Sequence, residues 1–188
     1  MKKVTLLFFS LAAVVTLSSC GGSKEAASPK GFNEIVVPCA DQGRSDATMF
    51  RASSSATSRD MATCREKALL MTKQRLASLI SSTMKSVTER YVNEMEVADA
   101  SNFEQTFENM TRDIVKQKLV EVAITCEKVG QKEDGSYETY MALEVSKDVI
   151  YNGIDKGIAK DKKLEVMYDR EKFKAKFDEE MDKMSSEY

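Results

Sequence analysis

The sequence contains no histidine, and only four of its 188 residues are cysteine. The lack of histidine removes the commonest metal ligand and the usual base that activates a cysteine nucleophile. No two cysteines have the Cys-x-x-Cys spacing of many zinc and redox sites. These absences argue against a metal centre and a thiol-dependent enzyme, so we expect neither a metal nor a cofactor.

The sequence also lacks an apolar run of comfortable membrane-spanning length near its start. The stretch from Val4 to Leu17 is shorter than the ~20 apolar residues that a spanning helix needs. Lys2 and Lys3 precede it, and small residues follow it. Basic residues, an apolar stretch and small residues come in the order of a secretory signal. The order predicts a signal peptide over residues 1–19.

The residues Leu17-Ser18-Ser19-Cys20 resemble the lipobox of bacterial lipoproteins. The resemblance implies cleavage before Cys20 and attachment of diacylglycerol to its thiol, with three acyl chains such as palmitate in the finished anchor. Each buried methylene contributes about 0.8 kcal/mol to membrane binding, so three chains would hold the protein firmly. The alternative is an ordinary signal peptide, with Cys20 as a spare thiol.

Small and polar residues follow Cys20, which is typical of a flexible tether, and we expect a lipidated tether over residues 20–32. Gly21 stands where some Gram-negative bacteria place aspartate as a signal for inner-membrane retention. We therefore expect an outer-membrane lipoprotein, in either the periplasmic or the surface-facing leaflet.

Removal of 19 of the 188 residues leaves 169, a length that suits one domain. Without Lys2 and Lys3, the 28 basic residues become 26 against 30 acidic residues, and the formal charge is −4. A negative charge argues against generic binding of nucleic acid.

Three cysteines remain, and disulfides persist in compartments outside the cytoplasm. Cys64 shares a helical face with Met61 and Met71, so we expect it to be a buried thiol. Cys39 and Cys126 then form the default disulfide.

The pattern of apolar residues predicts an α+β fold. A β-rich run predicts a first strand over Glu34 to Pro38, and small residues predict another strand over Thr48 to Thr57. Thr57 to Asp60 matches a capping box, and a helical pattern then continues to about Tyr91. A helix of ~50 Å is longer than a compact domain needs, so we expect a bend or break near Ser81 to Thr83.

The remaining pattern predicts a helix, a β-hairpin and two more helical segments. We expect a helix over Asn102 to Lys116, and then strands over Leu119 to Val129 and Tyr137 to Val145 that Asp134-Gly135 joins in a turn. A helical segment follows Ser146-Lys147-Asp148, and Gly153 and Gly157 weaken it. The last expected element is an amphipathic helix over Arg170 to Met184. Alternation places Val120, Val122, Ile124 and Cys126 on the helix-facing side. We expect one domain over residues 33–160, followed by a C-terminal helical region over 161–188.

This order of elements resembles the LPP-twenty family of small bacterial outer-membrane lipoproteins, roughly from Phe50 to Val145. Four stretches carry the resemblance: the strand of small residues, the "ARxxA"-like motif within Met61 to Leu69, the stretch Arg75 to Ile80, and Tyr140 to Glu144 near the end of the hairpin. The departures are Cys64 and Thr72 in place of alanines, and Ser55 in place of glycine. The resemblance implies a compact α+β domain, also seen in surface-appendage accessory proteins, and no enzymatic activity.

An apolar stripe in the last helix lies outside the family-like region. It consists of Phe173, Phe177, Met181 and Met184. The stripe either docks on the domain or binds a partner, such as an envelope protein or a second copy, and both interpretations stay open. Two other sets on the long helix have ordinary explanations: we expect Met61, Met71, Met84 and Met95 to be core residues, and Arg65, Arg75, Lys85 and Arg90 to be a solvated face.

Two function classes remain. The first is a non-catalytic lipoprotein of the cell envelope that offers a surface to a protein or an envelope polymer. The second is an envelope hydrolase or thiol-redox protein, using Cys39, Cys64 or Cys126, or the hairpin glutamates Glu121, Glu127, Glu138 and Glu144. Alternation predicts a solvent-facing position for these glutamates, and the first class requires no unusual residue. We therefore favour the first class.

Overall fold

The structure is a computed structural model that describes residues 33, 35–97 and 99–186. The expected signal peptide, Cys20 and the tether over 20–32 lie outside the described residues. The chain divides into two units, and the fold described below is that of Val37–Tyr188.

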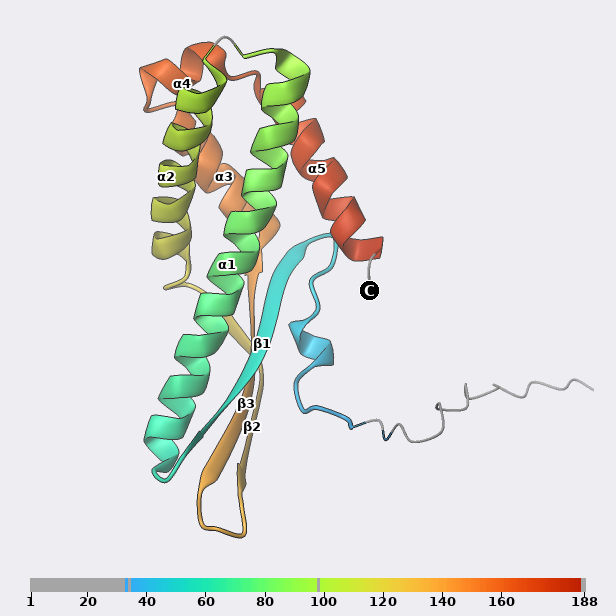
Figure 1. The fold of residues 1–188 in the computed structure, drawn as a ribbon, viewed down its shortest axis with the longest axis vertical. Helices are drawn as coiled ribbons and strands as arrows, with labels where there is room; N and C mark the ends of the chain where they lie inside the picture. Colours follow the sequence, from blue (N-terminus) through green and yellow to red (C-terminus); the bar gives the residue numbers. More distant parts are fainter. Residues whose placement is uncertain (1–32, 34, 98, 187–188) are drawn as a thin grey trace, which may run out of the picture. The chain divides into compact units, whose positions relative to one another are not determined.

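The described residues form an α+β fold, as the sequence predicts (Figure 1). In chain order the elements are η1 (Asp41–Gly43), β1 (Met49–Ser58), α1 (Met61–Met95), α2 (Ala100–Lys118), β2 (Ala123–Gln131), β3 (Tyr137–Ser146), α3 (Lys147–Ile158), α4 (Lys162–Met167) and α5 (Arg170–Ser186). None of these helices has the length and apolarity to cross a membrane.

The three strands form an antiparallel sheet in the order β1-β3-β2. β2 and β3 form the predicted hairpin, and Gly135 takes a positive φ of 80° in the turn. Asp134 does not take a positive φ, and its carboxylate accepts hydrogen bonds from the amide and hydroxyl of Ser136, at 2.9 and 2.6 Å.

The predicted alternation of β2 is wrong, because its register with β3 shifts between Ile124 and Cys126. Glu127 pairs with the buried Met141, so it lies on the helix-facing side of the sheet. Cys126 pairs with Ala142 and lies on the opposite side. An extra residue at a β-bulge reverses which side chains face the core, and no apolar pattern in β2 marks that point.

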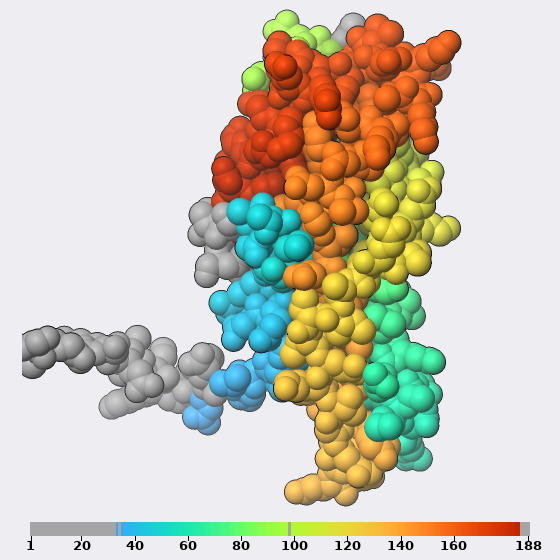
Figure 2. All heavy atoms as spheres, turned by 180° about the vertical axis from the view of Figure 1, so that it is seen from behind, coloured from blue at the N-terminus to red at the C-terminus, as the bar shows by residue number. Residues whose placement is uncertain are grey.

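The predicted strand over Glu34 to Pro38 is also wrong, since the described residues 35–38 form no strand. The chain turns there, and the Ala40 amide donates to the Val37 carbonyl at 3.3 Å. η1 follows and packs on the face of the sheet that α1 leaves uncovered, where Gly43 approaches Ser53 of β1 closely. Figure 2 shows this blue segment beside the yellow and orange strands.

α1 is one continuous helix, which corrects both the predicted break and the predicted cap. Asp60 is the N-cap and accepts a hydrogen bond from the Thr63 amide at 2.8 Å, while Thr57 belongs to β1. The first half of α1 covers the sheet, and the second half packs against α2 and α5 (Figure 1). Each half therefore buries its own apolar face, and the helix needs no bend.

The small residues of α1 lie where it crosses the sheet. Cys64, Ala68 and Thr72 are buried there, whereas Met61 and Met71 are 49% and 42% exposed. These two methionines are therefore not core residues, contrary to the prediction, because small side chains bring the helix close to the sheet and leave its flanks outside. Met84, on the second half of α1, is buried as predicted.

The last helix docks on the domain. Phe173, Phe177 and Met181 are buried in the same core as α1, and Met184 is half-buried against it. The Phe173 ring lies 5.2 Å from that of Phe107, centroid to centroid. Of the two interpretations that the sequence left open, the structure shows docking of the stripe on the domain, and binding of a partner by these four residues stays untested.

Candidate functional site

The structure joins Cys39 and Cys126 by a disulfide, the pairing favoured from the sequence. The bond connects the segment before η1 to strand β2. Cys64 is a free, fully buried thiol whose Sγ lies 3.2 Å from the carbonyl oxygens of both Ala56 and Tyr137, which share its single S–H donor. Cys64 is the free thiol of the described residues, and it lines neither of the two hollows described below.

The hairpin glutamates do not converge on a common point. Each forms an ion pair with a different cation: Glu121 with Lys118, Glu127 with Arg65, Glu138 with Lys132 and Glu144 with Arg51. The hydrogen bond from Arg65 lowers the pKa of Glu127, whereas a catalytic acid needs a raised pKa. Within the described part of the chain, no three Cys, Asp or Glu residues gather to hold a metal ion.

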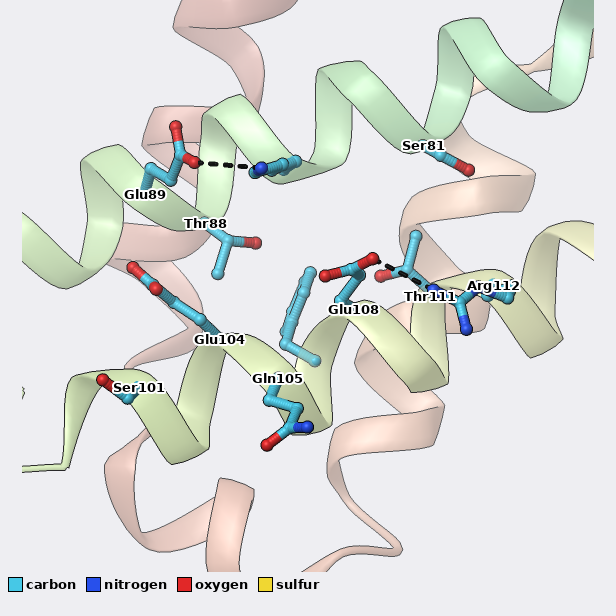
Figure 3. A pocket seen from close by; sticks show the side chains of 11 residues that line it. Ser81, Thr88, Glu89, Ser101, Glu104, Gln105, Glu108, Thr111 and Arg112 are labelled. Carbon is cyan, nitrogen blue, oxygen red and sulfur yellow. Dashed lines mark hydrogen bonds and ion pairs between the residues drawn. The ribbon is translucent and has the colours of Figure 1, made fainter.

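A groove of about 320 Å³ lies between α1 and α2 (Figure 3). It is lined by Ser81, Lys85, Thr88, Glu89, Ser101, Glu104, Gln105, Phe107, Glu108, Thr111 and Arg112. Both helices therefore present polar residues at helical spacing beside their buried faces. From the sequence we expect Lys85 on a solvated face and a bend or break near Ser81, and we expect neither residue to form a site.

The groove has a buried floor. Phe107 contributes an apolar ring that is almost fully buried, and Thr88 and Thr111 lie beside it with 3% exposure each. The Thr88 hydroxyl donates to the Met84 carbonyl at 2.8 Å. The Thr111 hydroxyl is buried and has no hydrogen-bond partner within the described residues.

The rim of the groove carries three carboxylates and two cations. Lys85 pairs with Glu89 at 3.7 Å, and Arg112 pairs with Glu108 at 3.0 Å. Figure 3 shows Glu89 and Glu104 toward one end of the groove and Arg112 toward the other. Glu104 is half-buried and forms no ion pair or hydrogen bond with the described residues, which leaves one negative charge without a partner.

A second hollow of about 650 Å³ lies beside α2, α3 and α4. Its lining includes Lys118, Lys156, Lys160 and Lys162. Lys118 and Lys156 lie in the last turns of α2 and α3, where cations stabilise a helix by interacting with its dipole. The helix ends thus explain part of this basic cluster, and the groove between α1 and α2 is the stronger candidate site.

Comparison of the chain with known protein families, with curated proteins and with solved structures found no match. The resemblance to the LPP-twenty family stays a prediction from the sequence.

Proposed function

We propose that the protein is a non-catalytic lipoprotein of the bacterial envelope, anchored in the outer membrane through Cys20, as in the LPP-twenty family that its sequence resembles. The observation that carries the proposal is the order of Lys2 and Lys3, an apolar stretch and Leu17-Ser18-Ser19-Cys20. The Cys39–Cys126 disulfide supports it, because such bonds persist in oxidising compartments.

The surface that this lipoprotein offers is the groove between α1 and α2. The core covers the apolar stripe of α5, so the stripe is occupied. The groove combines a buried aromatic floor with a charged rim, which is the usual composition of a binding site for a small ligand. A membrane tether raises the local concentration of the groove near envelope components.

Metabolic labelling with an alkyne analogue of palmitate tests the anchor. We expect the full-length protein to incorporate the label and to fractionate with the outer membrane. The Cys20→Ala variant should incorporate none, while Cys64→Ala, which removes a buried thiol, should be labelled like the parent. Equal labelling of the Cys20→Ala variant and the parent would refute the proposed anchor.

A further inference from the structure

We infer that the groove between α1 and α2 binds a small aliphatic amine, with its ammonium group at Glu104 and its hydrocarbon chain over Phe107. The inference rests on the proposed function in taking this groove as the surface that the lipoprotein offers. Three independent features of the groove support it: its floor, an unpartnered hydroxyl and its charge.

The floor fits an aliphatic chain. Phe107 is nearly fully buried yet lines the groove, so its ring is at the bottom of the hollow rather than on an open face. A volume of about 320 Å³ lies near the lower end of the range for small-molecule sites, which excludes a folded partner and suits a short flexible chain.

The hydroxyl of Thr111 lacks a partner that comparable residues have. Thr72, Thr83 and Thr88 are buried in α1, and each donates to the carbonyl four residues earlier. The hydroxyl of Thr111 makes no such bond, although α2 is described throughout and offers the equivalent carbonyl of Phe107. Figure 3 shows this hydroxyl directed toward Glu108 and the groove. Burial of a polar group without a partner is unfavourable, and an N–H donor of the ligand would relieve it.

The charge of the groove selects a cation. The carboxylates of Glu89 and Glu108 already have partners on their own helices, Lys85 and Arg112. Glu104 is half-buried and has no partner within the described residues, so the groove keeps one uncompensated negative charge. An ammonium group would neutralise that charge, whereas an anion would be repelled and a neutral ligand would leave it unpaired.

Three molecules of equal chain length test the charge requirement by isothermal titration calorimetry of the purified, detergent-solubilised mature protein. They are cadaverine, 1,5-pentanediol and glutarate, which are cationic, neutral and anionic. We expect saturable 1:1 binding of cadaverine and at least tenfold weaker binding of the other two. No saturable heat with cadaverine, or equal affinity for all three, would overturn the inference.

Variants at the two polar groups test the assigned positions. Glu104→Gln should weaken cadaverine binding at least tenfold, while the matched control Glu66→Gln changes the same charge on an exposed position of α1 away from the groove and should leave the affinity unchanged. Thr111→Val should weaken binding several-fold. If Glu104→Gln reduces folding, as circular dichroism would show, Ser81→Lys serves instead, because its added ammonium should compete with the ligand. Equal affinity of the groove variants and the control would contradict the assigned site.

The same titration with the Cys20→Ala protein separates this inference from the proposed function. Cys20→Ala should bind cadaverine like the parent, because the groove and the anchor use different residues. A parent protein that binds cadaverine but carries no acyl chain would refute the anchor and leave the groove assignment standing. An acylated parent that does not bind cadaverine would refute the groove assignment alone.

Discussion

Lys147 is the residue at which burial and charge conflict most clearly. The residue is 2% exposed, and its Nζ has no hydrogen-bond partner among the described residues. It lies 5.4 Å from the centroid of the Phe50 ring, a favourable contact for a cation. Burial lowers its pKa, although the negative charges of Asp46 and Asp182 oppose this effect. Its position in the first turn of α3 also places a positive charge at the positive end of a helix.

Lys147→Met should therefore stabilise the protein. Methionine fills a similar volume without an ammonium group to desolvate, and we expect the free energy of unfolding at pH 7 to rise by about 1–2 kcal/mol. Because the folded-state pKa is lowered, the destabilising contribution of Lys147 is full below that pKa and disappears as the pH rises toward the ordinary value of 10.5. Urea denaturation as a function of pH measures both effects.

Lys163 provides the matched control, because it is exposed and Lys163→Met removes the same charge at the surface. A loss of stability in Lys147→Met, or an equal gain in both variants, would show that burial of the Lys147 ammonium group is not unfavourable.

At the scale of elements, α2 and α3 make their closest approach at two glycines. A Cβ at Gly153 would lie 2.7 Å from Cγ2 of Ile114, and one at Gly157 would lie 2.6 Å from Sδ of Met110. From the sequence alone, we expect these glycines only to weaken a helix. The structure adds a reason for them, since they let α2 pack against α3.

The two glycines should respond differently to alanine. Gly153→Ala meets a β-branched side chain that cannot move away, so overpacking should lower the free energy of unfolding by about 1–2 kcal/mol despite the better helix propensity of alanine. Gly157→Ala meets the flexible side chain of Met110 and should change stability by less than about 0.5 kcal/mol. Denaturant unfolding of the pair measures the difference, and equal effects would contradict the proposed packing.

The docking of α5 gives a further prediction. Phe173 contacts Phe107, Tyr91 and Tyr168 by ring packing, so Phe173→Ala should destabilise the protein by about 3–5 kcal/mol. Glu171→Ala, at an exposed position of the same helix, should cost little. Thermal unfolding followed by circular dichroism compares the two. If both variants melt like the parent, α5 is not part of the cooperative core.

Helices and strands could be predicted from the sequence where apolar residues recur at one constant spacing over the whole element. The helical spacing of Phe103 and Phe107 and the alternation of Met141 and Leu143 identify α2 and β3 almost to their ends. The bulge near Cys126 was not predictable, because one inserted residue reverses the faces of a strand without changing its composition. The groove was not predictable either, since each helix shows only a polar stripe and the tertiary fold alone brings the two stripes together.

At the scale of the whole molecule, the described domain and the expected anchor depend on different parts of the chain. The domain has its own core and its own disulfide. The residues that predict the anchor end at Cys20, well before Cys39. The domain should therefore fold without lipid, and the lipid that we propose at Cys20 would serve only to place the groove at a membrane.

Intact mass spectrometry of the native protein, extracted with detergent, tests this account most directly. We predict a mature chain that begins at Cys20, carries three acyl chains and contains one disulfide. A lipid-free chain that begins at another residue would contradict the envelope anchor and the localisation proposed from it.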